Sequence, residues 1–146
     1  MAPEEPTRAE ALAAAQRALA RRDLSERELR DRLQRAGLDP AAAEEVMEQL
    51  RRGGLVDDAR FAEERARVLA ERGKGDAAIR FDLERHGVAL GLIERTVIAL
   101  EPERDRAEKV VARRGAGPKT ARLLASRGFP EELVTLVTET DIAHGP

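Results

Sequence analysis

The chain has 146 residues, a formal net charge of −2 and no cysteine. These properties exclude a disulfide framework, a thiolate metal site and a cysteine nucleophile, and they give no overall electrostatic attraction to nucleic acid. Aromatic residues make up 2% of the chain, and Ala, Arg, Glu and Leu dominate, so we expect an all-α protein. No apolar run approaches the roughly 18 residues of a membrane span and no signal peptide is recognisable, so we expect a soluble, cytoplasmic protein.

The first predicted repeat spans residues 7–53 and follows a polar tail at residues 1–6. Two capping boxes, in which a hydroxyl and a carboxylate satisfy the first backbone N–H groups of a helix, open its first and second helices. They are formed by Thr7 with Glu10 and by Ser25 with Glu28. Pro40 follows Asp39 at the first position of a third helix, where the missing N–H has no cost, and this helix is expected to end near Arg52.

The second predicted repeat spans residues 54–101. Asp57 or Asp58 is expected to start its first helix, because a carboxylate at that position accepts a hydrogen bond from the following turn. Gly73 is expected to end this helix, since glycine adopts the left-handed conformation of many helix exits. Asp76 is then expected to cap the second helix of the repeat.

Three glycines at equivalent positions reveal an internal repeat: Gly37, Gly87 and Gly128. A leucine stands four residues before each of them, an apolar residue follows each, and a further helical pattern comes next. A third, degenerate repeat is therefore predicted at residues 102–140, with a second tail at residues 141–146. The expected fold is an elongated tandem array of three three-helix repeats, each resembling a helix-turn-helix bundle.

An ordered set of residues in the second repeat is specific as a set, although none of its members is specific alone. The set is Gly54, Leu55, Asp57, Asp58, Arg60, Phe61, Ala62, Arg72, Gly73, Lys74, Gly75, Ile79, Leu83, Gly87 and Val88. In this order the residues resemble the RecX family, the bacterial regulators that bind the recombinase RecA and restrain it. The resemblance extends back to Leu24 and weakly forward to about residue 137. It departs from the family pattern at Phe81, where such proteins usually carry a polar residue, and in the slightly acidic net charge.

The resemblance implies a regulator that lodges in the groove of the RecA filament on single-stranded DNA and inhibits ATP hydrolysis, strand exchange and filament growth. It also makes Arg72, Lys74 and Arg80 candidates for partner contact, the alternative being a solvated turn. We expect a monomer, and weak direct contact with single-stranded DNA is left open. A stand-alone helix-turn-helix DNA-binding protein is the alternative function, and it would need a recognition helix with several exposed base-reading side chains.

Phe81 lies two positions from both Ile79 and Leu83, and therefore roughly opposite the apolar stripe that those two residues define. Two interpretations follow. A neighbouring repeat covers the ring, or the ring is exposed and anchors a partner protein, since aromatic side chains are favoured at such positions. Because the chain has only three Phe and no Tyr or Trp, a platform that stacks the bases of a single strand is not expected.

Six basic residues follow one another without an intervening Asp or Glu: Lys109, Arg113, Arg114, Lys119, Arg122 and Arg127. The simplest interpretation of this basic run is a solvated face. Arginine also pairs bidentately with phosphates and carboxylates, so the run is a candidate surface for a DNA backbone or an acidic protein. Two helices and a turn cannot aim all six side chains at one backbone, so we expect about two to four usable contacts and weak binding to free DNA.

No catalytic residue, cofactor or metal is predicted. The Gly-Lys-Gly turn at residues 73–75 lacks the first glycine and the hydroxyl residue of a phosphate-binding loop. Asp57 and Asp58 are adjacent at a helix start, where they point in different directions and have a sufficient role as caps. His86 and His144 have no second histidine or cysteine at ligand spacing. The protein is therefore not expected to be an enzyme.

Overall fold

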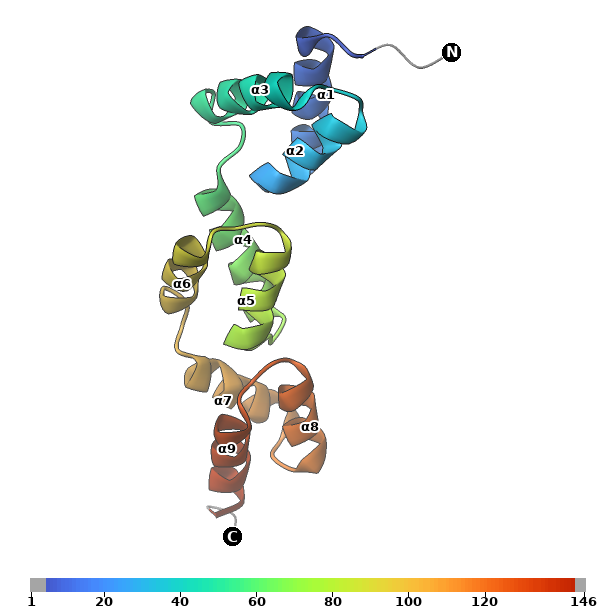
Figure 1. The fold of residues 1–146 in the computed structure, drawn as a ribbon. Coiled ribbons are helices and arrows are strands. Elements are labelled where there is room, and N and C mark those ends of the chain that lie inside the picture. Colours follow the sequence, from blue (N-terminus) through green and yellow to red (C-terminus); the bar gives the residue numbers. More distant parts are fainter. Residues whose placement is uncertain (1–4, 144–146) are drawn as a thin grey trace. The chain divides into compact units, whose positions relative to one another are not determined.

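The computed structural model describes residues 5–143, and the side chains of residues 5–139. These residues form nine α-helices and no strand, which confirms the all-α prediction (Figure 1). The helices are α1 (Arg8–Arg21), α2 (Glu26–Arg35), α3 (Pro40–Arg52), α4 (Asp58–Glu71), α5 (Asp76–Arg85), α6 (Leu90–Ile98), α7 (Glu103–Arg114), α8 (Pro118–Ser126) and α9 (Glu131–Ala143). Across the described residues no helix has both the length and the apolar character that crossing a membrane requires.

The first compact unit comprises residues 5–61 and 86–88. Its helices α1, α2 and α3 pack around a single apolar core. The buried core residues are Ala11, Ala15, Leu24, Leu29, Leu33, Leu38, Ala43, Val46, Met47, Leu50 and Val56. Four of them on α3 follow a spacing of three and four residues, which places them on one face of the helix.

The helices of the first unit begin where the capping signals lie. The Thr7 side chain accepts a hydrogen bond from the backbone N–H of Glu10. Ser25 and Glu28 form the predicted capping box at the start of α2. Asp39 caps α3, and Pro40 occupies the first turn. Each cap satisfies N–H groups that have no partner inside the helix, so local sequence marks where these helices start.

The two predicted tails are only partly within the described residues. Glu5, from the tail at residues 1–6, accepts a hydrogen bond from the backbone N–H of Asp39 at 2.9 Å. Helix α9 continues to Ala143 and so includes the first residues of the predicted tail 141–146. Residues 1–4 and 144–146, with His144, lie outside the described residues.

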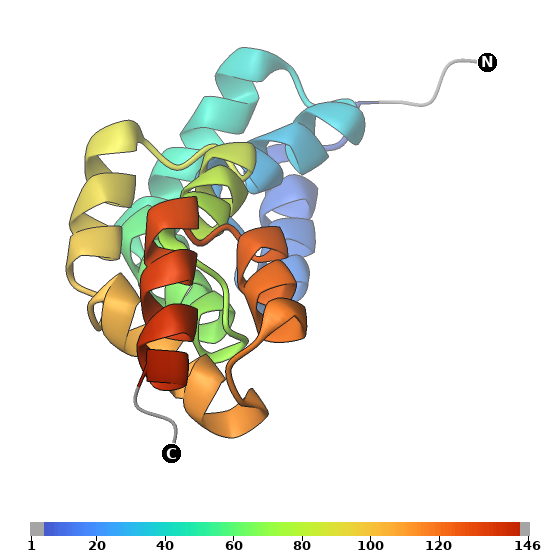
Figure 2. The same cartoon turned by 90° about the horizontal axis from the view of Figure 1, so that it is seen from below.

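The second compact unit comprises residues 62–85 and 89–143. Within it, α5 packs on α6, and α9 lies against both α7 and α8 (Figures 1 and 2). The helices α7, α8 and α9 enclose a core made of Ala107, Val110, Val111, Leu124, Phe129, Val134 and Val137. Ile79 on α5 and Ile93 on α6 are also buried. On α7, the residues Ala107, Val110 and Val111 are therefore the ones that face this core.

Two hydrogen bonds in the first unit link the start of α2 to residues of the next predicted repeat, and we call such a pair of bonds a joint. The Ser25 hydroxyl donates a hydrogen bond to the carbonyl of His86 at 2.6 Å. The Asp58 carboxylate, at the start of α4, accepts one from the backbone N–H of Glu26 at 2.9 Å. Burial raises the pKa of the Asp58 carboxyl, and the hydrogen bond from Glu26 opposes that shift. Residues far apart in sequence thus complete the N-terminus of α2.

A similar joint lies in the second unit, at the start of α5, where a backbone N–H takes the place of the Ser25 hydroxyl as one of the two donors. The backbone N–H of Gly75 donates to the carbonyl of Arg127 at 2.8 Å. The Glu103 carboxylate, at the start of α7, accepts from the backbone N–H of Asp76 at 2.6 Å. The prediction that Asp76 caps α5 is wrong, because Asp76 is the first helical residue and its carboxylate binds Arg106 instead.

The repeat glycines explain why the joints can close. Gly37, Gly87 and Gly128 all have positive φ angles, between +82° and +98°, as their equivalent positions predict. A Cβ atom on Gly128 would lie 2.8 Å from the Cβ and 2.9 Å from the backbone nitrogen of Ala78 on α5. Glycine is therefore required there both for the backbone conformation and for close approach.

Gly128→Ala is expected to lower the free energy of unfolding by about 3 kcal/mol, because the new methyl group meets backbone atoms and φ is +90°. Gly91→Ala is the matched control, since no atom would lie within 4 Å of its Cβ in α6. That change should be neutral or stabilise by about 0.5 kcal/mol. Urea unfolding of both variants checks the difference, and equal midpoints would contradict this role of Gly128.

Candidate functional site

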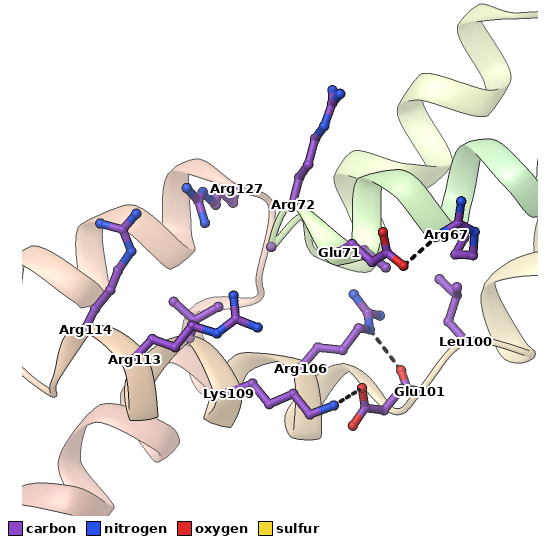
Figure 3. Close-up of a pocket in the computed structure, with 13 residues that line it drawn as sticks. Arg67, Glu71, Arg72, Leu100, Glu101, Arg106, Lys109, Arg113, Arg114 and Arg127 are labelled. Atoms are coloured by element: carbon purple, nitrogen blue, oxygen red, sulfur yellow. Dashed lines mark hydrogen bonds and ion pairs between the residues drawn. The ribbon is translucent and has the colours of Figure 1, made fainter.

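A groove of about 720 Å³ in the second unit gathers seven of the unit's basic side chains. It lies among the end of α4, the turn after it, helix α7 and the last residue of the α8 turn (Figure 3). Its lining residues are Arg67, Ala70, Glu71, Arg72, Gly73, Leu100, Glu101, Arg106, Lys109, Val110, Arg113, Arg114 and Arg127. Seven of these thirteen residues are basic and two are acidic, so the groove is strongly positive although the whole chain is not.

One side of the groove is neutralised by ion pairs, and we call it the paired side. Arg67 binds Glu71 at 2.7 Å and also binds Glu64. The hydrogen bond to Glu64, followed by the one to Glu71, raises the pKa of Arg67 above its usual value. Lys109 binds Glu101 at 2.9 Å. Figure 3 shows the contacts of Arg67 with Glu71 and of Lys109 with Glu101 on one side of the groove. An incoming anion would have to displace a carboxylate there, so this side is poorly suited to anion binding.

Arg106 forms the floor of the paired side and is only 6% exposed. Its guanidinium donates to the carbonyl of Glu101 at 2.9 Å, to the carbonyl of Lys74 at 2.8 Å and to the carboxylate of Asp76. A buried charge is tolerated because its donors are satisfied in this way. Arg106 therefore holds the Gly-Lys-Gly turn and the start of α5 on α7, and it is not available to a ligand.

The other side of the groove, which we call the unpaired side, is formed by Arg72, Arg113, Arg114 and Arg127. Over residues 5–139, the structure gives these four guanidinium groups no hydrogen bond and no ion pair. They come from three different segments, the turn after α4, the end of α7 and the end of α8 (Figure 3). Four donors that lack acceptors and share one open groove can bind an anion.

Gly73 allows Arg127 to reach this groove. A Cβ atom at position 73 would lie 2.5 Å from Nη1 of Arg127 and 3.7 Å from Val110, and φ of Gly73 is +82°. The first glycine of the Gly-Lys-Gly turn thus has a packing role as well as ending α4. The lysine between the glycines does not line the groove.

The structure divides the predicted partner-binding residues into two groups. Five of them line the groove: Arg72, Lys109, Arg113, Arg114 and Arg127. Five lie elsewhere: Lys74, Arg80, Phe81, Lys119 and Arg122. Four of the six members of the basic run therefore converge, in keeping with the geometric limit expected for two helices and a turn.

Phe81 and Arg80 lie on α5, outside the groove. Phe81 is 64% exposed, and the guanidinium carbon of Arg85 lies 5.9 Å from the centre of its ring. Arg80 makes two hydrogen bonds to Glu94 on α6, at 2.9 and 3.3 Å. The ring is thus accessible to a partner, whereas the charge of Arg80 is already balanced.

Sequence reasoning missed Arg67 and Arg106 as groove residues. Arg106 carried a usable signal, because it precedes Ala107 and stands four residues before Val110, and so continues the apolar stripe of α7. An arginine on such a stripe must find buried acceptors. Arg67 carried no such signal, since its place in the groove depends on where α7 lies.

Among the described residues, no three His, Cys, Asp or Glu side chains gather in a way that could hold a metal ion. The predicted capping role of Asp57 is confirmed, because its carboxylate accepts from the backbone N–H groups of Ala59 and Arg60 at 2.9 and 3.2 Å. The chemistry that the groove offers is that of its four unpaired arginines, which can bind an anionic partner.

Two family models match the chain. Residues 11–50 match the model described as RecX, first three-helix domain, and residues 57–97 match RecX, second three-helix domain. These ranges fall within the first two predicted repeats.

Curated relatives and solved structures agree with the family models. The regulatory protein RecX of Halorhodospira halophila is 36% identical over 127 residues, covering 78% of this chain and 79% of its own length. That of Xanthomonas campestris is 34% identical over 120 residues, covering 75% and 74%. The crystal structure of RecX from Lactobacillus salivarius has a TM-score of 0.78 with 19% identity, covering 93% of this chain and 97% of that one. The last comparison concerns the fold alone.

Arg106→Met is expected to lower the free energy of unfolding by about 3 kcal/mol, because it leaves Asp76 and two carbonyl groups without their buried donor. Arg104→Met is the control on the same helix, since Arg104 forms only an exposed pair with Glu108. Its expected effect is below about 0.5 kcal/mol. Similar losses in the two variants, measured by urea unfolding, would show that Arg106 has no special role.

Proposed function

The chain belongs to the RecX family of regulatory proteins, and on that premise we propose that it binds the RecA filament on single-stranded DNA and inhibits the ATPase and recombinase activities of RecA. The observation that carries the proposal is the match of two consecutive three-helix units to the two RecX models. In this proposal the protein acts by binding alone, as a monomer and without a cofactor.

Two chemically different surfaces of the second unit support a binding role. The groove offers four unpaired arginines, and the outer side of α5 offers the exposed ring of Phe81. Basic and aromatic side chains are the ones that contribute most to protein interfaces. Several modest contacts on one chain strengthen one another through effective concentration when the partner is a repeating filament. Arg72, Lys74, Arg80 and Phe81, together with the basic run, remain the proposed contact residues.

The alternative, a stand-alone helix-turn-helix DNA-binding protein, has less support. Its third helices would have to present basic or amide side chains to base edges. On α3 the exposed Gln49, Arg51 and Arg52 stand beside three exposed glutamates, Glu44, Glu45 and Glu48. On α6 the exposed Arg95 stands beside Leu90 and Ile98, which are 69% and 78% exposed. Acidic and apolar side chains at these positions disfavour insertion of either helix into a DNA groove.

Substoichiometric amounts of the protein are expected to lower the rate of ATP hydrolysis by RecA on single-stranded DNA. The measurement is a coupled ATPase assay at fixed RecA and DNA, with filaments confirmed by electron microscopy. An unchanged rate at equimolar protein, with filaments present, would refute the proposed inhibition.

Phe81→Ala is expected to weaken binding to the RecA filament about 30-fold, which corresponds to the ~2 kcal/mol typical of an aromatic anchor. Because the ring is 64% exposed, the free energy of unfolding should change by less than about 1 kcal/mol. Ile98→Ala removes a side chain that is 78% exposed on α6 and serves as the control. Equal affinities of wild type and Phe81→Ala in a filament pull-down titration would exclude the anchor role.

A further inference from the structure

The two sides of the groove differ in hydrogen-bonding capacity. On the paired side, Glu71 and Glu101 occupy the donors of Arg67 and Lys109. On the unpaired side, a guanidinium group offers five N–H donors and no acceptor, and four such groups are present. The guanidinium groups of the unpaired side therefore offer only hydrogen-bond donors, and a ligand that binds them must offer mainly hydrogen-bond acceptors.

We propose that the unpaired side, formed by Arg72, Arg113, Arg114 and Arg127, binds the phosphate backbone of a nucleic-acid strand without reading its bases. This inference deepens the proposed function by assigning one surface of the regulator to nucleic acid, and it rests on that function for its biological setting. Phosphodiester and sugar oxygens are acceptors that match the donors of the unpaired side, and guanidinium groups bind phosphate in a bidentate manner.

An acidic peptide fits the unpaired side less well. Its main chain carries N–H donors as well as carboxylate acceptors, and a bound peptide needs acceptors for them. The carboxylates of the groove are already engaged by Arg67 and Lys109, so they are poor acceptors for the N–H groups of a peptide. The sugar-phosphate backbone of a DNA strand has no such donors, so the unpaired side favours it over an acidic protein segment.

The lining also predicts that binding is independent of base sequence. The residues that form the groove include no aromatic side chain, so bases have no ring on which to stack. Four arginines from three segments contact a charged backbone at several points, and such contacts position a strand but carry no sequence information. Binding should therefore be weak, alike for different bases, and steeply dependent on salt.

The basic run itself provides a matched test. Arg113→Glu with Arg114→Glu reverses two charges of the unpaired side. Lys119→Glu with Arg122→Glu reverses two equally unpaired charges of the same run, on α8 but outside the groove. As proposed contacts these two residues would meet RecA protein, which is absent from this test, so they serve here as the control for binding to a bare strand. Both double variants change the net charge by the same amount, so a general loss of positive charge affects them alike. Arg113→Gln with Arg114→Gln is a milder groove variant, and urea unfolding shows whether each protein is folded.

Affinity is measured by fluorescence anisotropy with labelled oligo-dT and oligo-dA of about 20 nucleotides, without RecA. For wild type we expect equal affinity for the two strands and a slope of log K against log salt near −3, as for about four phosphate contacts on a single strand. At physiological salt the groove variant should lose at least about tenfold in affinity, with a slope of about half, while the Lys119 and Arg122 variant changes less than about twofold.

Three outcomes would overturn the proposal. Equal losses in the two double variants would attribute binding to net charge. A strong preference between oligo-dT and oligo-dA would mean that bases are read. Displacement of the strand by polyglutamate at lower charge concentration than by polyphosphate would assign the groove to acidic protein. Because these measurements contain no RecA, they can fail while inhibition of the RecA ATPase persists, and inhibition can fail while strand binding persists.

Discussion

The structure depends on one constraint, which is that the first N–H groups of a helix must find acceptors. At α5 a carbonyl and a carboxylate of the following repeat accept from two backbone N–H groups. At α2 a carboxylate of the following repeat accepts from the backbone N–H of Glu26, and a carbonyl accepts from the Ser25 hydroxyl. His86 and Arg127 supply the carbonyls, and each stands just before a repeat glycine. Because the glycine has no side chain, the turn can approach the helix start closely enough to bond. The repeats are thus joined by the completion of a helix end.

The same constraint builds the candidate site. The bond from Gly75 to the carbonyl of Arg127 places the end of α8 beside the turn that follows α4. Arg106 then attaches α7 to that turn through Lys74 and Asp76. Side chains separated by more than 50 positions, such as Arg72 and Arg127, therefore line one groove. The groove is a consequence of the joint, and a change that loosens the joint would also disperse the arginines.

Local features of the fold could be predicted from the sequence, and pairings across repeats could not. Capping boxes, prolines and repeat glycines located the helix starts and the equivalent turns, because these signals act within a few residues. The carboxylate of Asp76 looked like a cap and instead binds Arg106, since a buried guanidinium competes for it. In the basic run, Lys119 and Arg122 could not be told from Arg113 and Arg114, because only the position of α7 relative to the α4–α5 turn separates them.

The distribution of charge reconciles a basic groove with a net charge of −2. Acidic residues are spread over every described helix except α8, for example Glu44 and Glu48 on α3 and Glu131 and Glu132 on α9. At physiological ionic strength exposed charges are screened from one another over roughly 8 Å, so attraction inside the groove is set mainly by its own lining, which has seven basic and two acidic residues. The acidic residues outside the groove do reduce the long-range attraction that would hold the protein on any polyanion. A strand would then be retained only where other contacts already hold the protein close to it, which suits a regulator of a filament better than a protein that binds DNA by itself.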